Sequence, residues 1–133
     1  MSAERATYLD SSALVKLAVR EPESAALLRY LRRKRPLVSS ALARTEVIRA
    51  LLPLGAATVE RGQEVLRRVE LLRINDRILN TAGSLDPPEL RSLDAIHLST
   101  ALQFGKELGA IVTYDARMAL AAQTLGCTIA RPT

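Results

Sequence analysis

The chain has 133 residues, of which 48% are hydrophobic and 25% charged, a balance typical of a globular domain with a sizeable core. No hydrophobic run reaches the roughly 18 residues that a membrane-spanning helix needs. Residues 1–7 lack the apolar stretch of a secretory signal, and the single cysteine, Cys127, excludes an internal disulfide. We therefore expect a cytoplasmic protein that makes no membrane contact and folds as one domain over residues 1–133.

Basic residues outnumber acidic residues by 19 to 14, which gives a net charge of +5. Sixteen of the basic residues are arginines, and their planar guanidinium groups match the geometry of phosphate. This composition favours a nucleic-acid partner, although a solvated basic surface would explain it equally well. Aromatic residues make up only 3%, which argues against a protein that stacks bases on aromatic side chains.

In the first half of the chain, short apolar runs alternate with helical patterns. Ser11 and Ser12 are able to cap the first helix, Ser40 the third, and Pro53 with Gly55 breaks that third helix. The patterns predict strands at 6–9 and 37–39 and helices at 13–17, 22–35 and 42–52.

The second half repeats the alternation, with Ser92 as a candidate cap and with Gly109 and Gly126 as helix stops. Strands that alternate with helices predict a parallel sheet covered on both faces, with all carboxyl ends at one edge. Ligands bind along that edge in such folds. The predicted helices span 58–69, 77–83, 93–108 and 116–125, and the predicted strands span 71–74, 110–114 and 127–130.

Four acidic residues fall where they could meet at this edge. Asp10 directly follows the first predicted strand, and Asp115 directly follows the fourth. Asp94 lies in the first turn of the apolar helix at 93–108, and Glu46 lies on the face of its helix that points toward the core boundary. Clustered carboxylates repel one another unless they share protons or bind cations, and oxygen ligands favour Mg²⁺ or Mn²⁺.

Each acid also has a structural explanation. Asp10 and Asp115 could serve as helix caps, and Asp94 could be favoured by the helix dipole. Glu46 could pair with Arg49, three residues further on. The serines beside Asp10 and Asp94 could cap in their place, so these helices do not require the carboxylates.

These residues resemble the PIN-domain nucleases, and most closely the VapC-type toxins of bacterial toxin–antitoxin pairs. The resemblance runs from about Ala6 to Ala130 and rests on four segments in order. The segments are Tyr8-Leu9-Asp10-Ser11-Ser12-Ala13-Leu14-Val15-Lys16-Leu17, Ser40-Ala41-Leu42-Ala43-Arg44-Thr45-Glu46-Val47, Leu93-Asp94-Ala95-Ile96-His97-Leu98-Ser99-Thr100-Ala101 and Val112-Thr113-Tyr114-Asp115.

The resemblance implies a three-layer α/β/α Rossmann-like PIN fold, with a five-stranded parallel sheet of order 3-2-1-4-5. It implies a metal-dependent endoribonuclease that uses a metal-activated water and leaves a 5′-phosphate and a 3′-hydroxyl. The implied partners are RNA, a cognate VapB-like antitoxin and a second copy of the chain. Mg²⁺ or Mn²⁺ would be held by Asp10, Glu46, Asp94 and Asp115, with hydroxyl support from Ser12 and Thr113. Met118 departs from the family, which often has an aromatic residue there.

Other polar residues are weaker candidates for a functional role. His97 is the only histidine, so acid–base catalysis by two histidines is excluded, and we expect it to pack or to support the acids. Cys127 should simply pack in an apolar strand. The basic run at 32–35 could be a solvated helix end or a contact to RNA or an acidic partner. Candidate RNA contacts nearer the acids are Arg117, Arg44 and Arg49.

Other classes of protein place different residues at these positions or remain as alternatives. A phospho-acceptor signalling domain needs an acidic pair after the first strand and a lysine near the last, but the last lysine is Lys106. An aspartate-nucleophile phosphatase needs an acid where Ser12 stands, and no glycine-rich phosphate loop is present. A PIN nuclease that is not a toxin, or a catalytically silent nucleic-acid-binding module, remains as an alternative.

Overall fold

The protein is described over residues 5–133 by a computed structural model, which contains one five-stranded sheet. All four strand pairs are parallel, and the strand order is β3-β2-β1-β4-β5, so the predicted fold class and order are confirmed. The strands are β1 (Ala6–Leu9), β2 (Leu37–Ser40), β3 (Glu70–Leu72), β4 (Leu108–Val112) and β5 (Ile129–Ala130).

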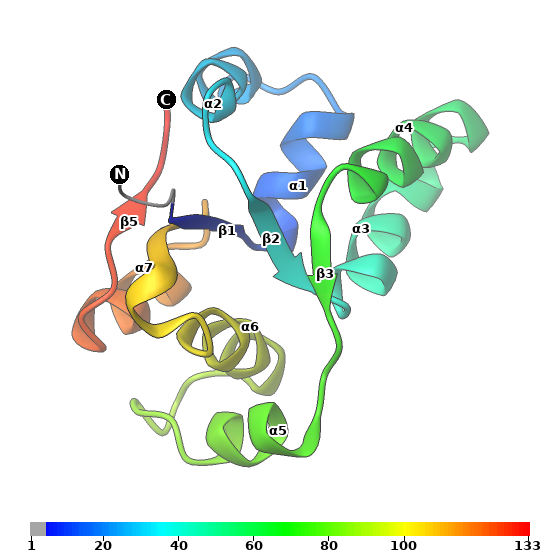
Figure 1. Cartoon of the computed structure of the whole chain (residues 1–133). Helices are drawn as coiled ribbons and strands as arrows, with labels where there is room; N and C mark the ends of the chain where they lie inside the picture. Colours follow the sequence, from blue (N-terminus) through cyan, green and yellow to red (C-terminus); the bar gives the residue numbers. More distant parts are fainter. Residues whose placement is uncertain (1–4) are drawn as a thin grey trace.

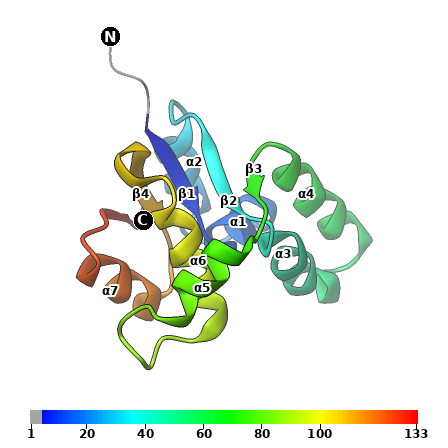
Figure 2. The same ribbon diagram turned by 60° about the horizontal axis from the view of Figure 1, so that its bottom comes forward.

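Helices cover both faces of the sheet, which makes three layers (Figure 1). One face carries α1 (Ser11–Ala18), α2 (Ser24–Leu31), α3 (Ala43–Leu51) and α4 (Ala56–Arg67). The other face carries α6 (Ser92–Leu102) and α7 (Ala116–Thr124), and α5 (Asp76–Gly83) packs beside α6 (Figure 2). Among residues 5–133, no helix is both long and apolar enough to cross a bilayer.

Alternating side chains of the central strand supply both cores. Tyr8 packs with Val38, Ile111 and Leu98 beneath α6 and α7, whereas the next residue, Leu9, packs beneath α1 to α4. This is the period of two that a strand imposes when both of its faces are covered. Because β1 lies between β2 and β4, the residue that follows it reaches the middle of the carboxyl edge.

The long apolar helix ends earlier than predicted. We expected a helix at 93–108, but α6 ends at Leu102, a short 3-10 turn spans Gly105–Glu107, and β4 begins at Leu108. Gly105 has a φ of 52°, a left-handed conformation that ends a helix. The leucine that seemed to close the helix therefore begins the strand.

Several other boundaries also differ from the predicted ones. α2 ends at Leu31, so the basic run at 32–35 lies outside it, and α4 begins at Ala56 after Gly55, whose φ is 99°. β3 begins one residue before and ends two residues before the predicted strand at 71–74. β5 keeps only two residues of the predicted strand at 127–130, because it lies at the sheet edge and pairs with β4 alone. The 3-10 turn at Leu52–Leu54 confirms the break at Pro53.

Candidate active site

The carboxyl edge of the sheet carries the four predicted acids. Asp10 follows β1, and Asp115 lies three residues after β4, the strand paired with β1. Asp94 comes from the first turn of α6 and Glu46 from the first turn of α3. The negative charges of Asp115, Asp10 and Glu46 all act on the carboxyl group of Asp94, so the four acids share one electrostatic environment.

Asp10 is buried and held from three directions. Its Oδ1 atom accepts hydrogen bonds from Ser12 Oγ at 2.6 Å and from the Ala13 amide at 3.0 Å, and its Oδ2 atom accepts one from Thr113 Oγ1. Burial raises the pKa of Asp10, while these hydrogen bonds oppose the rise by stabilising the charged form. The carboxylate is therefore fixed in place before any ligand arrives.

Asp10 also caps a helix, which confirms the structural explanation that the sequence offered for it and for Asp115. Its side chain caps α1 at the Ala13 amide, so our expectation that Ser11 and Ser12 could cap in its place was wrong. Asp115 likewise caps α7, where its Oδ1 atom accepts from the amides of Arg117 and Met118 at 2.9 and 3.2 Å. Ser92 is no cap either, because it is the first residue of α6 and Arg91 precedes it.

Thr113 connects these two capping acids. Its side chain is fully buried, and its hydroxyl donates to Asp10 Oδ2 while it accepts from the Asp115 amide at 3.1 Å. Ser12 makes a parallel link, because its hydroxyl donates to Asp10 and accepts from the Tyr114 amide at 3.1 Å. Both hydroxyls thus tie the end of β1 to the end of β4.

Glu46 is half-buried and faces α1 and α6. Its Oε1 atom lies 2.6 Å from Ser11 Oγ and 2.6 Å from His97 Nε2, so it pairs with His97 and not with Arg49. Burial raises the pKa of Glu46, but the hydrogen bonds from His97 and Ser11 outweigh burial and hold the pKa below its usual range. Glu46 is therefore kept charged.

His97 is buried, as expected for a supporting residue, and is held on both ring nitrogens. Its Nδ1 atom lies 2.7 Å from Tyr8 Oη, and burial raises the pKa of Tyr8, which remains a neutral donor. A carboxylate only accepts, so Nε2 carries the proton toward Glu46 and Nδ1 accepts from Tyr8. Tyr8 thus fixes the ring that orients Glu46.

Asp94 differs from the other acids because its carboxylate makes no hydrogen bond to any of residues 5–133. Partial burial, followed by the negative charge of Asp115, raises its pKa. The side chain borders a largely apolar cavity of about 390 Å³ that Arg91, Arg117 and Leu120 also line. Its oxygens are therefore free to bind a ligand that carries positive charge.

The three candidate RNA-binding arginines lie in different surroundings. Arg117 is exposed and shares the cavity with Asp94, so it stands beside the acids. Arg44 and Arg49 are exposed on α3 and do not line that cavity. Arg91, which does line it, was missed because it lies just outside the four segments that carry the family resemblance.

The acids suit a hard divalent cation by their chemistry. Over residues 5–133, no three of the His, Cys, Asp and Glu side chains come close enough together to hold one ion jointly. The donors are nevertheless all carboxylate oxygens, the ligands that Mg²⁺ and Mn²⁺ prefer. Like charges act on the unpaired carboxylate of Asp94, and a cation would relieve that repulsion.

Two further residues of the site were missed. Ser11 bonds to Glu46 and lies 3.4 Å from His97 Nε2, whereas the sequence suggested only a capping role. Tyr8 was taken as part of an apolar strand. The available signal was that Tyr8 lies two residues before Asp10. Because side chains alternate along a strand, Tyr8 therefore points to the face of the sheet that carries α6 and His97.

Comparison with known proteins identifies the family. Residues 7–123 match the PIN domain. The chain is 58% identical over 127 residues to Ribonuclease VapC46 of Mycobacterium tuberculosis, covering 96% of this chain and 98% of that protein. It is 40% identical over 129 residues to Ribonuclease VapC35 of the same species, covering 94% and 96%.

Solved structures agree with the fold. A toxin–antitoxin complex from Klebsiella pneumoniae matches with a TM-score of 0.73 and 20% identity, over 96% of this chain and 98% of that one. Mycobacterium tuberculosis VapC20, described as a toxin that cleaves the sarcin–ricin loop, matches with a TM-score of 0.72 and 17% identity, over 95% and 99%. The chain therefore belongs to the PIN-domain family and, within it, to the VapC-type ribonuclease toxins.

Proposed function

We propose that this chain is an endoribonuclease, the toxin of a toxin–antitoxin pair, and that it hydrolyses RNA with the help of Mg²⁺ or Mn²⁺. The observation that carries the proposal is the unpaired carboxylate of Asp94, set among three other acids beside a cavity that Arg117 lines. Such a cluster is costly unless a cation neutralises it. The ribonuclease names of relatives at 58% and 40% identity support the same activity.

The ion would be held by Asp10, Asp94 and Asp115, with Glu46 at the border of the site. When bound, it would supply a water of lowered pKa and would stabilise negative charge on the phosphate. Because no three acids reach one point without the ion, some of them would act through bound water, as Mg²⁺ sites commonly do.

The remaining residues have positioning and binding roles in this proposal. Ser12 and Thr113 keep Asp10 oriented, and His97 with Ser11 keeps Glu46 charged and aimed at the cluster. Arg117 would bind the phosphate next to the scissile bond, because it is exposed beside Asp94. Arg44 and Arg49 would contact RNA further along α3.

The proposed partners follow the same family. We infer a VapB-like antitoxin, supported by the fold match to a toxin–antitoxin complex, and a second copy of the chain as a homodimer. The exposed leucines at positions 52 and 54 offer apolar surface for such contacts. We also propose that the protein acts in the cytoplasm, where its RNA substrate would be found.

The test is cleavage of a mixed cellular RNA pool by purified chain free of any partner, with Mg²⁺, with Mn²⁺ and with EDTA. The matched variants are Asp94→Asn and Asp76→Asn, since Asp76 is an exposed acid in the first turn of α5 whose charge is not among those that act on Asp94. We expect metal-dependent products with 5′-phosphates from the wild type and from Asp76→Asn, and none from Asp94→Asn. Cleavage that survives EDTA would refute the metal mechanism.

Metal binding is tested separately by thermal unfolding. A cation that binds only the folded protein raises the melting temperature. Millimolar Mn²⁺ should raise the melting temperature of the wild type and of Asp76→Asn, and this rise should be smaller in Asp94→Asn. A metal-induced rise without cleavage of any RNA would favour a silent binding module.

A further inference from the structure

The two edges of the sheet carry opposite charges. Acids follow the strands at the carboxyl edge, whereas basic residues precede four of the five strands at the amino edge. Each of these four basic residues lies one or two residues before the first residue of its strand. In the spatial order β3-β2-β1-β4 they are Arg68, Arg35, Arg5 and Lys106, and Arg33 and Lys34 add to them; we call these six residues the basic row.

Three neighbouring hollows that share lining residues place the basic row on one surface. Arg68 and Arg35 line a hollow of about 480 Å³, and Arg35 lines the next, of about 470 Å³, together with Arg33, Lys34 and Arg5. Arg5 and Lys106 line the third, of about 440 Å³. Since adjacent strands lie roughly 5 Å apart, the row extends over about 15 Å.

The cations of the row are exposed and almost free of acids. Within the part of the chain that the structure describes, Arg68 makes the only ion pair of the row, a loose one of 3.8 Å to Glu64. Glu70 borders the first hollow and Glu107 follows Lys106, but neither forms an ion pair with the row. Six cations therefore stand beside three acids, and within residues 5–133 only Arg68 is paired with one of them.

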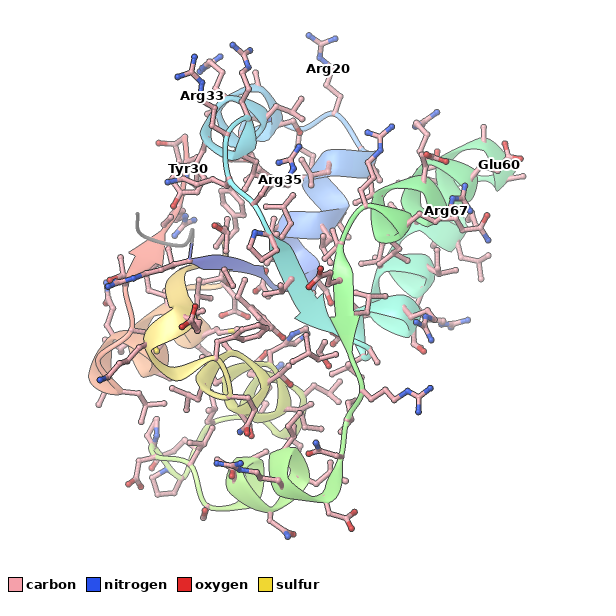
Figure 3. All side chains as sticks on the ribbon, viewed as in Figure 1. Arg20, Tyr30, Arg33, Arg35, Glu60 and Arg67 are labelled. Atoms are coloured by element: carbon pink, nitrogen blue, oxygen red, sulfur yellow. The ribbon has the colours of Figure 1, made fainter. Side chains whose placement is uncertain are left out.

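Parts of the row are already held in place. Arg35 donates to the carbonyls of Leu31 and Lys34, and the ammonium of Lys34 lies 5.0 Å from the centre of the Tyr30 ring. Figure 3 shows Tyr30, Arg33 and Arg35 at the α2 end of the molecule. Ordering these side chains beforehand lowers the entropy that binding would cost.

Backbone packing supports the same surface. Gly109 in β4 lies in two of the hollows, and a Cβ atom there would be 3.1 Å from Arg5 Cβ and 3.2 Å from the Ala6 carbonyl oxygen. A glycine thus lets β4 approach the start of β1 closely. This approach keeps Arg5 and Lys106 on neighbouring strands of one continuous edge.

We propose that the basic row binds the phosphate backbone of RNA, as a second contact opposite the candidate active site. A line of arginine-rich cations suits a chain of phosphates. A protein partner would usually insert an apolar anchor. The exposed Leu28 borders a neighbouring hollow that Arg35 and Arg68 also line, but no exposed leucine of residues 5–133 borders the three hollows of the row. The inference rests on the proposed function, because that function makes RNA the substrate.

The geometry adds a requirement on the substrate. From Arg5 to Asp10 the chain runs along β1, a distance of roughly 15 Å at the rise of a strand. An RNA that contacts both edges must therefore extend several nucleotides beyond the scissile bond. The basic row would add affinity for long RNA and leave the chemistry at the acids unchanged.

The test compares two double variants of the full chain. Arg5→Gln/Arg33→Gln removes two cations that share the central hollow, and Arg73→Gln/Arg77→Gln removes two exposed arginines that follow β3 and line none of the three hollows. The probe is fluorescent polyuridylate of about 40 nucleotides, long enough to span several sites. Binding is measured by anisotropy in EDTA, so that no RNA is cut.

We expect the row variant to bind polyuridylate about five- to tenfold more weakly, with a slope of log Kd against log salt that falls by about 1.4 for two lost phosphate contacts. The control variant should stay within about twofold of the wild type. An equal loss of affinity for polyuridylate in both variants would overturn the proposal. Polyglutamate that displaces the labelled polyuridylate as well as unlabelled RNA does would also overturn it. If the row variant melts at a lower temperature, Arg68→Gln/Lys106→Gln repeats the test at the two ends of the row.

Cleavage of RNA with Mn²⁺ reports on the proposed function independently. A chain that binds polyuridylate through the row but cuts no RNA leaves this inference standing and refutes the nuclease. If the wild type cuts RNA and the two double variants bind polyuridylate equally well, the nuclease activity is supported and the proposed role of the basic row is refuted.

Discussion

The Nε2 atom of His97 lies 2.6 Å from the Oε1 atom of Glu46, which joins α6 to α3 across the carboxyl edge of the sheet. The ring cannot turn away, because Tyr8 holds its other nitrogen. One buried relay of three side chains therefore sets the position of an acid at the site.

Tyr8→Phe tests this relay. The change keeps the ring but leaves Nδ1 of a buried histidine without its donor, so we expect a loss of about 1–3 kcal/mol in the free energy of unfolding and lower activity. Denaturant unfolding and RNA cleavage measure the two effects. Tyr30→Phe is the control, since Tyr30 is not part of the relay. Equal effects of both changes would show that the relay does not position Glu46.

Thr113→Val tests the hydroxyl between Asp10 and Asp115. Valine has a similar shape but can neither donate to Asp10 nor accept from the Asp115 amide, so we expect instability of about 1–3 kcal/mol and at least a tenfold loss of activity. Thr113→Ser should restore both. Thr58→Val, at a buried threonine of α4, should lower stability alone. Full activity in Thr113→Val would contradict the role of the hydroxyl.

Asp94→Asn should stabilise the protein in EDTA. The folded state raises the pKa of Asp94, so it binds that proton more tightly than the unfolded chain does and is destabilised once the proton is lost. The gain from asparagine should therefore be absent near pH 3, appear as the pH rises past the ordinary pKa of about 3.9, and persist at neutral pH. We expect an increase of roughly 2–5 °C in the melting temperature there.

The control for this effect is Asp76→Asn, which removes an exposed acid from the first turn of α5. Its melting temperature should be unchanged or slightly lower, because the helix dipole favours that charge. A wild type that is as stable as Asp94→Asn at every pH would show that the acids do not repel one another in the folded protein.

Gly62→Ala tests the packing of α4 on α3. A Cβ atom at Gly62 would overlap Cδ1 of the buried Leu51, so we expect a loss of about 1–3 kcal/mol in the free energy of unfolding. Gly83→Ala, at the end of α5 with no atom within 4 Å of the new Cβ, should instead add about 0.4–1 kcal/mol. Denaturant unfolding measures both, and a stabilised Gly62→Ala would show that the two helices can separate.

The parallel sheet and the edge of the acids could be predicted from the sequence, because they depend on alternation and on residues next to strand ends, whereas the strand order came from the resemblance to the PIN-domain nucleases. Asp10 and Asp115 came from such positions. The end of α6 could not be predicted in the same way, since a buried helix and a buried strand are both apolar. Only the positive φ of Gly105 separates Leu102 from Leu108.

The supporting contacts of the site were harder to predict than its acids. Ser11 was taken for a cap, and its bond to Glu46 depends on how α1 is rotated against α3. The position of Glu46 beside His97 required two helices from opposite faces of the sheet to meet, a property of the assembled layers that no local pattern contains.

Asp10 and Asp115 are acids of the candidate site and also helix caps. Substitutions at these two positions therefore affect the charge of the site and the stability of the helices separately. Asparagine caps a helix about as well as aspartate does, so exchanging one oxygen for an amide nitrogen removes charge from the cluster and leaves the start of α1 or α7 supported. Alanine would remove the cap as well. If the proposed function holds, a single nucleotide change that converts either aspartate to asparagine would yield a folded but inactive copy, a short route by which a lineage could silence the protein and retain its binding surfaces.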